Sequence, residues 1–508
     1  MTNPAMHRCL QVLDTQQLIC EAILSGSEPH ASLAALAVTC KQLCEPALVA
    51  LWSEMDDVLP LLRLLPEDLF HLVQVCATGG TRKGASGERM HYHYTSAGSF
   101  QAPPLYRISR AVKVKDWQRW DLYAPLVKRL TLKFPTQLIT HLLEPSTALQ
   151  LASAALDRSS SLLPCLVKYE LEFYPAFGTV DIVLLQLLGM IPGSGLKKLT
   201  LKTHHELANT AFLPRILSLR CPSITHLDIV FDMQSTGRAN SNASADVELK
   251  CAVIDAYAQG ITSLREVSHL HLSFIHPSLF SSIASLPRLT SLTLDVTHSV
   301  LEPLLPPSSD ESPTAPPLLY SSTLEYLHIR ARQWTRAMDT LYRIGDTPSL
   351  HTLSISTSAS APSSSESTSL TLAINQLLTR SGIESPSRSS IPTLQHCRVD
   401  FEYSAGLFHH VEEGRASPLD DLLDSLGNIP HITDLGMRVV LAADVVPARR
   451  LLAKIFGPTP GLLLPEEGGR RWKSLRELRL YQRADGVYSL FDVDDVRMLR
   501  AWRPWLML

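Results

Sequence analysis

The stretch LTSLTL, residues 289–294, carries apolar residues at its first, fourth and sixth positions. The same spacing returns with starts at residues 127, 166, 196, 224, 267, 324, 350, 394, 432 and 475, which makes eleven copies. Within each copy, apolar and polar residues alternate as they do in a strand with one buried face. A single copy arises easily by chance, so it is the ordered recurrence that indicates a repeated structural unit.

Helical periodicity follows many of the copies, whose starts are 22 to 44 residues apart. Three intervals place apolar residues at i, i+3, i+4 and i+7, namely Trp334, Ala337, Met338 and Leu341; Leu370, Ala373, Ile374 and Leu377; and Leu419, Leu422, Leu423 and Leu426. One strand–helix unit cannot bury its apolar face alone, whereas stacked units share a continuous core. The sequence therefore predicts a stacked βα array with its strands in one parallel sheet.

Over roughly residues 125–490 this pattern resembles the leucine-rich repeat family, in its long-repeat, ribonuclease-inhibitor-like form. The resemblance implies an α/β fold, a βα solenoid whose strands line a concave surface. The Asn or Cys that closes the usual repeat motif is mostly absent here. We therefore expect the turns of this array to be less regular than the family pattern.

The stretch SLAALAVTCKQLCEPALVALWSEM, residues 32–55, holds two short helical patterns around Pro46. A first helical turn tolerates proline, so Pro46 belongs at the start of the second pattern. An earlier amphipathic run at 10–24 supplies a third helix. The domains expected are a helical module at 1–76, a linker and lead-in segment at 77–124, and the solenoid at 125–508.

The order of these pieces, followed by LLRLLPEDL and DWQRWDLYAPLVKRLTL, resembles the F-box-like leucine-rich-repeat proteins of mushroom-forming (basidiomycete) fungi. The resemblance implies a small all-α F-box-like module that binds the Skp-type adaptor of a cullin-RING ubiquitin ligase. The positions that match the family pattern, some as adaptor contacts and some as the module's own core, are Leu33, Leu36, Leu43, Pro46, Ala47 and Trp52. The Leu-Pro that usually opens the first F-box helix is missing, and HRCLQVLD stands there instead.

In a horseshoe-shaped array, the concave surface is lined by residues that follow the second and third apolar positions of each copy. They are Lys133, Glu170, Glu172, Lys202, Asp228, His271, Asp295, His328, Arg330, Arg398, Asp400, Arg438, Arg479 and Tyr481. This mixture of signs favours a protein partner over nucleic acid. The candidate partner-binding residues are Lys202, Asp228, His271, Arg330, Arg398, Arg438 and Arg479; a solvated strand face without a ligand is the alternative.

Composition narrows the setting in which the chain works. The 508 residues carry a formal charge of −3, which provides no global field for nucleic acid or an acidic membrane. The nine cysteines are an odd number without paired spacing, which suits a reducing compartment. No secretory signal or membrane-spanning run is recognisable, so we expect an intracellular protein, cytoplasmic or nuclear.

No motif supplies a catalytic, metal or cofactor site. In GGTRKGASG, residues 79–87, Ala85 and Ser86 stand where a phosphate loop needs Lys and Ser or Thr. The HYHY stretch at 91–94 has no Cys or carboxylate pair at ligand spacing nearby, and the GSG at 193–195 lies in a turn ahead of a repeat strand. We therefore expect no enzyme and no cofactor.

Four Ser/Pro-rich stretches, at 234–246, 303–317, 357–369 and 384–392, bury too little apolar surface to order and are expected to be disordered loops. Together, the resemblances imply a non-catalytic substrate-recognition subunit of a cullin-RING (SCF-type) ubiquitin ligase, with an unknown protein substrate. The alternative is a free-standing leucine-rich-repeat scaffold that binds no ligase adaptor and whose N-terminal helices only cap the array.

Overall fold

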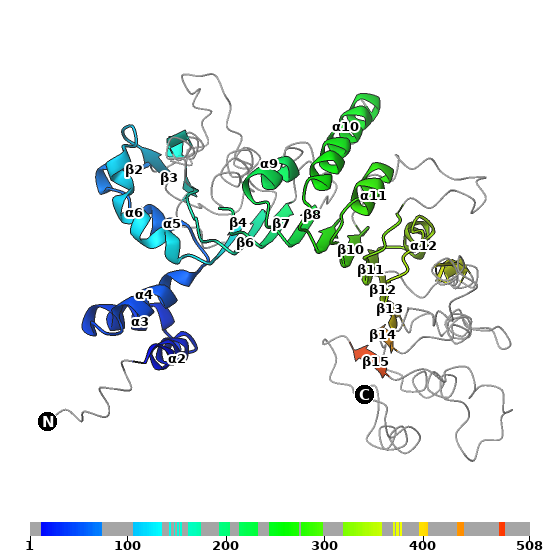
Figure 1. Cartoon of the computed structure of the whole chain (residues 1–508), viewed down its shortest axis with the longest axis horizontal. Helices are drawn as coiled ribbons and strands as arrows, with labels where there is room; N and C mark the ends of the chain where they lie inside the picture. The colour runs from blue at the N-terminus through cyan, green and yellow to red at the C-terminus, as the bar shows by residue number, and fades with distance from the viewer. Residues whose placement is uncertain are drawn as a thin grey trace, which may run out of the picture. The chain divides into compact units, whose positions relative to one another are not determined.

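A computed structural model describes residues 12–73, 105–134, 161–173, 193–203, 213–231, 243–273, 276–297, 319–357, 396–404, 434–440 and 477–482, with a few positions between them. The chain divides into two compact units. Unit 1 comprises Met1–Asp232 and Gln259–Glu266, and unit 2 comprises Met233–Ala258 and Val267–Leu508. Each unit is described by itself below (Figure 1).

Unit 1 contains a parallel sheet in the order β1-β4-β6-β7-β8. Its strands are β1 (Glu54–Met55), β4 (Arg129–Phe134), β6 (Lys168–Phe173), β7 (Lys198–Thr203) and β8 (His226–Phe231). The helices described in this unit are α2 (Leu13–Leu24), α3 (Pro29–Thr39), α4 (Cys44–Ser53), α5 (Leu59–Leu62), α6 (Gln118–Tyr123) and α9 (Leu213–Arg220). Three short 3-10 helices accompany them: η1 (Glu67–Leu69), η2 (Val114–Trp117) and η3 (Ala124–Leu126).

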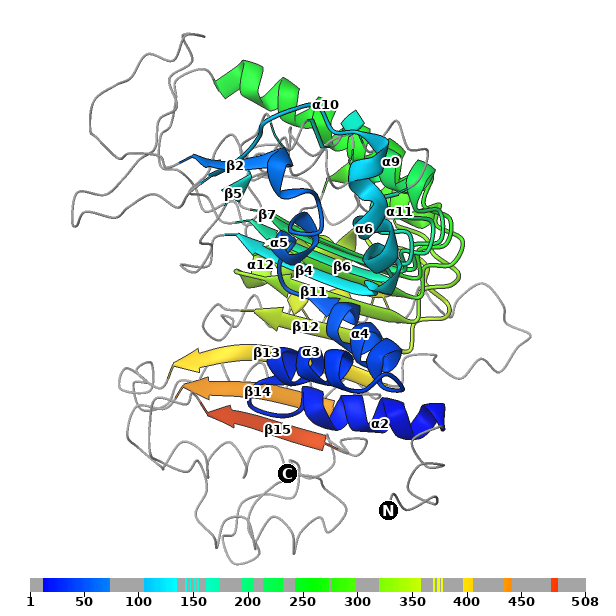
Figure 2. The same cartoon turned by 90° about the vertical axis from the view of Figure 1, so that its left-hand side faces the viewer.

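Unit 2 contains seven consecutive parallel strands, and in Figure 2 the arrows of β13, β14 and β15 point the same way. They are β9 (His269–Leu272), β10 (Ser291–Asp295), β11 (Tyr326–Ala331), β12 (Thr352–Thr357), β13 (His396–Ser404), β14 (Asp434–Val440) and β15 (Glu477–Gln482). Its helices include α11 (Pro277–Ala284) and α12 (Trp334–Tyr342). The long helix α10 (Ala243–Thr262) has residues in both units.

The repeat predicted from the sequence is confirmed strand by strand. Each of the eleven copies contains a strand that begins two residues after the copy starts, from β4 at Arg129 to β15 at Glu477. The first apolar residue of a copy lies just ahead of its strand, and in the copies where this side chain is described it is buried: Val127, Leu166, Leu196, Ile224, Val267, Leu289, Leu324 and Leu350. In each unit the strands and these residues form a parallel α/β array of repeated units.

Hydroxyl groups of serine and threonine join successive repeats at the residue before each copy. The Ser223 hydroxyl donates to the carbonyl of Leu196 at 3.2 Å, and the Thr323 hydroxyl donates to that of Leu289 at 2.8 Å. The Ser349 hydroxyl donates in the same way to the Ser322 carbonyl at 2.7 Å. Each donor directly precedes the first apolar residue of its copy, so these bonds satisfy turn carbonyls across the repeat boundary.

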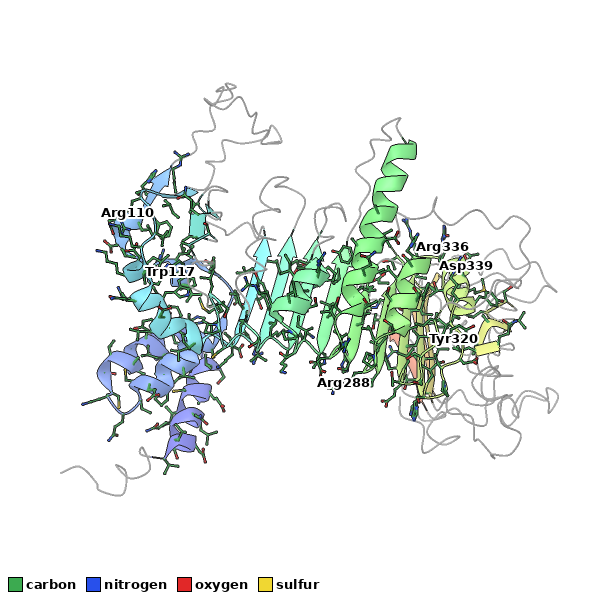
Figure 3. The ribbon with its side chains drawn as sticks, turned by 45° about the horizontal axis from the view of Figure 1, so that its top comes forward. Arg110, Trp117, Arg288, Tyr320, Arg336 and Asp339 are labelled. Atoms are coloured by element: carbon green, nitrogen blue, oxygen red, sulfur yellow. The ribbon has the colours of Figure 1, made fainter. Side chains whose placement is uncertain are left out.

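Helices cover one face of the strands in unit 2. Figure 1 shows α11 and α12 on the same side of β9–β12, and Arg336 and Asp339 of α12 lie on that side in Figure 3. The helix predicted around Trp334 is confirmed as α12, and its four periodic apolar residues are buried. Leu370, Ala373, Ile374 and Leu377 are also buried, whereas the periodic residues at 419–426 lie outside the described residues.

The three helices predicted near the N-terminus are present as α2, α3 and α4. Their small core consists of Cys20, Leu33 and Ala47, one residue from each helix. Pro46 lies in the first turn of α4, as expected for a residue that lacks a backbone N–H. The apolar spacing of the sequence thus correctly located the helices.

The helical segment runs directly into the sheet of unit 1. β1 follows α4 without a break and pairs with β4, Glu54 opposite Arg129 and Met55 opposite Leu130. The Trp52 ring lies 5.0 Å from that of Tyr123, which fixes α4 against α6. β1 was not predicted from the sequence, because two residues are too few to show an alternation.

A second, three-stranded sheet lies beside η1, with β2 (Phe70–Val73), β3 (Leu105–Ile108) and β5 (Leu142–Leu143). Arg110 follows β3 and uses all five of its N–H donors: to both oxygens of Asp68 (2.7 and 3.1 Å), to both of Asp116 (2.7 and 3.1 Å) and to the Ala111 carbonyl (3.2 Å). These bonds lower the pKa of the Asp116 carboxyl. Arg110 therefore ties η1 to η2, with Trp117 further along the same segment (Figure 3).

Two of the loop boundaries expected from composition are wrong. Residues 243–246 form the first turn of α10 rather than a disordered loop. Thr357 is the last residue of β12, because a β-branched residue continues a strand readily, and Ser369 is helical. The stretches at 303–317 and 384–392, and the rest of the other two, lie outside the described residues.

Candidate functional site

The candidate site is the face of the β9–β13 strands that α11 and α12 do not cover, which we call the open face of unit 2. Burial alternates along β9, β10 and β11, so every second residue stands on this face; on β12 the residue in register, Ser354, is itself buried. Its described side chains are His269, His271, Ser291, Thr293, Asp295, Tyr326, His328, Arg330, Thr352, Ser354, Ser356, His396 and Arg398. They are polar or aromatic throughout, as a solvated strand face requires.

Strand register places five of these residues in one row. His271, Thr293, His328, Ser354 and Arg398 are Cα partners across β9 to β13. Because neighbouring strands lie about 4.8 Å apart, the row spans roughly 19 Å. Arg330 stands two residues beyond His328 on β11, in register with Asp295 on one side and Ser356 on the other. The row therefore brings ionisable groups from separate repeats into one neighbourhood.

His328 is the centre of this neighbourhood. Burial lowers its pKa to about 4, with further lowering by the positive charges of Arg330, Arg398 and His271 and partial opposition from Asp295. Its Nε2 lies 3.1 Å from the Ser356 hydroxyl. The His328 ring also meets the Tyr326 ring edge to face, with centroids 6.4 Å apart. At neutral pH the imidazole is therefore uncharged, mainly because it is buried.

Asp295 is the one carboxylate among the side chains that β9–β12 place on the open face, all of which the structure describes. Its Oδ1 accepts hydrogen bonds from the backbone N–H and the hydroxyl of Thr297, at 3.0 and 2.5 Å. This carboxylate is therefore engaged by the end of its own strand. Asp295 keeps its negative charge in register with Arg330, so β9–β12 place charges of both signs on the open face of unit 2.

The equivalent face of unit 1 is organised differently. Lys168, Lys198 and Lys202 each lie within 4 Å of a carboxylate, at 3.5 Å from Glu170, 3.8 Å from Asp228 and 3.8 Å from Glu172. Asp228 also accepts a hydrogen bond from the Thr200 hydroxyl at 3.0 Å. Each cation of this set has its counter-charge on the same or the neighbouring strand, so the face is locally neutral.

The seven partner-binding residues predicted from the sequence fall in three places. Lys202 and Asp228 lie on the ion-paired face of unit 1. His271, Arg330 and Arg398 lie together around His328 in unit 2. Arg438 and Arg479 occupy β14 and β15, where Arg438 is in register with Glu402 and Arg479 with Gly436; their side chains are outside the described residues. The structure thus brings three of the seven together.

Sequence reasoning did not single out the residues that complete this neighbourhood. Tyr326, Thr293, Ser354 and Ser356 carry no charge, so a search for charged positions passes over them. The signal that finds them is positional: they occupy the third, fifth or seventh place of their copies, which the register sets side by side. His328 was included on the concave face, but its closeness to two arginines depends on strand pairing.

The adaptor-binding residues predicted from the sequence divide into inner and outer positions. Leu33, Leu43 and Ala47 are buried. Leu36, Pro46 and Trp52 are half-buried, Leu36 against the core of the three helices and Trp52 against Tyr123. The larger apolar side chains that α2–α4 and the residue before α2 expose are instead Val12, Leu13, Leu18, Leu24, Val38 and Val49.

The remaining motifs carry no site. Gly193 of the GSG turn is required by packing, because a Cβ there would lie 2.8 Å from the Pro164 carbonyl oxygen. The stretches at 79–87 and 91–94 lie outside the described residues. Within the described part of the chain, no group of His, Cys, Asp and Glu side chains is arranged to hold a metal ion. None of the helices described there has both the length and the apolar character to cross a membrane.

Comparison with known proteins adds little to these observations. No protein-family model matches the chain, and no curated protein does. Among solved structures, an internalin (inlF) from Listeria monocytogenes is similar, with 11% sequence identity over 70% of this chain and 88% of the internalin, at a TM-score of 0.24. A likeness at that score supports no argument about function, so the class of protein rests on the repeat itself.

Proposed function

We propose that the chain is a non-catalytic substrate receptor of a cullin-RING ubiquitin ligase. In this proposal α2–α4 bind the Skp-type adaptor, and the open faces of the strands bind the protein to be modified. The order of sequence pieces that resembles the F-box-like proteins motivates the first half. The accessible, polar strand faces of a repeat array, which are common partner-binding surfaces, motivate the second.

The observation that carries the proposal is the outer surface of α3. This helix, PHASLAALAVT, contains no Asp, Glu, Lys or Arg, and a helix that is apolar on all sides is normally buried. Here it buries only Leu33 completely and exposes Ala34, Ala35 and Val38, the last at 85%. An apolar helical surface of this kind is suited to a partner helix, which we assign to the adaptor.

The test is co-purification of the full chain with the Skp-type adaptor, comparing Val38→Glu with the parent. A charge placed in an apolar contact should reduce the recovered adaptor about tenfold or more. Leu219→Glu on α9 is the matched control, because Leu219 is 76% exposed on a helix of the repeat region. It should leave adaptor recovery unchanged, and neither variant should lower the melting temperature, since both side chains are exposed.

A free-standing scaffold is the second candidate, and the continuity of α4, β1 and β4 favours it. In that case the helices cover the edge strand of unit 1 and bind nothing. A parent protein that captures no adaptor, together with loss of protection in β4 when Leu33 is changed to Asp, would establish the capping role and overturn the receptor proposal.

A further inference from the structure

We propose that the outward side of residues 113–122 in unit 1 binds an acidic, amphipathic helix of a protein partner. These residues comprise η2 and most of α6. Their exposed side chains, which we call the η2–α6 surface, are Lys113, Val114, Lys115, Gln118, Arg119, Asp121 and Leu122. The inference uses neither α3 nor the open faces of the strands, so it goes beyond the proposed function.

Two large apolar side chains are almost fully open to solvent on this surface. Val114 is 84% exposed, and Leu122 is 71% exposed. Among the large apolar side chains in the described part of the chain, four are more than 70% exposed, and these two belong to one short helical segment. Apolar side chains exposed singly need no explanation, whereas two on one side of a segment indicate a contact surface.

The opposite side of the segment is anchored in unit 1. Trp117, labelled in Figure 3, and Trp120 are buried, and their rings meet edge to face with centroids 5.4 Å apart. The Trp120 indole donates a hydrogen bond to the Leu162 carbonyl at 2.9 Å. Asp116 is buried as well. The outward side chains therefore cannot turn inward, and a partner meets a surface that is already ordered.

The spacing of the exposed residues fits a helix as the partner. Val114, Gln118 and Leu122 follow one another at intervals of four, so they form one ridge along the outward side of the segment. A ridge of this kind packs into the groove between the side chains of a second helix. An extended peptide would instead need a free strand edge for its backbone, which a helical segment does not offer.

The charges beside the ridge favour an acidic partner. Lys113, Lys115 and Arg119 are exposed, and none of them is in an ion pair with a residue that the structure describes. Asp121 is the one carboxylate of the η2–α6 surface, all of whose side chains are described. Three exposed cations thus stand against one exposed anion.

Neighbouring residues do not reverse this balance. Residues 105–128 include six basic and two acidic residues, and the buried acidic one, Asp116, is bonded to Arg110. Arg110 also ties η1 to the segment, and η1 adds the acidic Glu67 and Asp68. Basic residues remain in excess after this addition. The partner helix is therefore expected to carry Asp or Glu beside its apolar residues.

Gln118 argues for a protein rather than a membrane as the occupant. It stands on the ridge between Val114 and Leu122, so its amide would enter the hydrocarbon together with them. Burial of an amide without a hydrogen-bond partner is costly. Side chains of a partner helix can both donate to this amide and accept from it.

The test uses the full chain and the fluorescence anisotropy of a labelled helical peptide of Leu, Ala and Glu, with Leu along one side and Glu on both flanks. Val114→Ser with Leu122→Ser should weaken binding of this peptide about tenfold or more. Lys115→Gln with Arg119→Gln should weaken it about threefold or more and make it less dependent on salt. Neither pair should lower the melting temperature, since all four side chains are exposed.

Leu219→Ser with Lys197→Gln is the matched control. Leu219 is 76% exposed on α9, and Lys197 is an exposed lysine of the same unit. This variant should change the affinity less than about twofold. An equal loss in the control and in the two test pairs would overturn the inference, since it would indicate attraction by overall charge and apolar surface alone.

A second peptide has the same composition, with Leu and Glu rearranged so that no side of the helix is apolar. It should bind about tenfold more weakly, because it has no apolar side to set on the ridge. Equal binding of the two peptides would overturn the inference.

Two further measurements address other occupants. Binding of the chain to vesicles that contain phosphatidylserine, lost in Val114→Ser with Leu122→Ser and found without peptide binding, would assign the surface to a membrane. Self-association in sedimentation velocity that is lost in the same variant would assign it to a second copy of the chain. Either result would overturn the inference, and we expect neither.

Failure here is distinguishable from failure of the proposed function. Adaptor capture depends on Val38 of α3, so Val38→Glu should leave peptide binding unchanged. Intact adaptor capture without peptide binding overturns this inference alone, and peptide binding without adaptor capture overturns the ligase role alone.

Discussion

The open faces of the two units stand on the same repeat, yet they hold their charges in opposite ways. In unit 1 the lysines of β6 and β7 have carboxylates on the same or adjoining strands, within 4 Å. In unit 2 the fifth positions of two copies hold His328 and Arg398 and a seventh position holds Arg330, while Asp295 accepts hydrogen bonds from Thr297. The repeat determines the position of each side chain on the face. The identity of the side chains determines whether the face can bind a charged ligand.

The largest expected effect concerns pH, and it tests whether burial on the open face of unit 2 keeps His328 uncharged. His328 titrates at about 4 in the folded chain and at 6.5 without its surroundings. The native state therefore binds fewer protons than the unfolded state between these values, so stability is complete above about pH 7 and falls as the pH decreases. The loss approaches on the order of 3 kcal/mol near pH 4.

Amide hydrogen exchange in β10–β12, measured at pH 7 and near pH 4.5, reports this loss of stability in the strands around His328. His328→Gln is the comparison, because glutamine keeps a polar side chain beside Ser356 and does not titrate. The variant should lose less protection than the parent over the same pH interval, with Arg330, Arg398, His271 and Asp295 unchanged. Parallel pH profiles would show that His328 is not held neutral by these neighbours.

An effect of intermediate size is expected when a carboxylate is placed beside the basic residues of unit 2, as the carboxylates of unit 1 lie beside its lysines. Thr293 lies in register between His271 and His328, so Thr293→Glu introduces a carboxylate among the cations. The pKa of His328 should rise toward 6.5, as seen by NMR titration of the imidazole.

Thr131→Glu is the matched control for that substitution. Thr131 occupies the same fifth position of its copy, on β4, beside Glu170 of the ion-paired face. It should not alter the His328 pKa. A similar rise of this pKa in both variants would mean that His328 responds to the net charge of the chain rather than to a carboxylate on the open face of unit 2.

Much of the fold was predictable because the same apolar spacing occurs eleven times in the sequence. Apolar residues at the fourth and sixth positions of each copy face the core, as Leu292 and Leu294 do, and the periodicity around Trp334 located α12. That the usual Asn or Cys is mostly absent was visible in the sequence, whereas the hydroxyl bonds between repeats were not. Ser223 has no distinguishing feature in the sequence. Only the structure shows that its hydroxyl donates a hydrogen bond to a carbonyl of the preceding repeat.

The sequence predicted which residues stand on the candidate surface, but it did not predict which of them form ion pairs. The rule for the concave face selected His271, Arg330 and Arg398 correctly as residues of one surface. It could not separate them from Lys202, because ion pairing depends on which strands become neighbours and on side-chain reach. Likewise, a helical pattern could not tell that Leu33 is buried and Val38 exposed, since α3 is apolar on both sides.

The smallest expected effect comes from removing the carboxylates that lie beside the lysines on the face of unit 1. Glu172→Gln with Asp228→Asn removes the carboxylates beside Lys202 and Lys198 and keeps the shape of each side chain. Both lysines are about two-fifths exposed, and partly exposed ion pairs contribute little to folding, so the free energy of unfolding should change by less than about 1 kcal/mol.

The same variant should bind a labelled peptide in which Glu and Ser alternate a few fold more tightly than the parent does, with a steeper dependence on salt, because two lysines are released from their counter-charges. Urea unfolding and anisotropy at two salt concentrations measure the two quantities, and Lys198→Ser with Lys202→Ser is the reverse control. A large loss of stability without any gain in binding would mean that the lysine–carboxylate contacts hold the strands of unit 1 together. The carboxylates of unit 1 would then serve to support its strands. Neutralisation of the lysine charges would not explain weak binding of acidic ligands to unit 1.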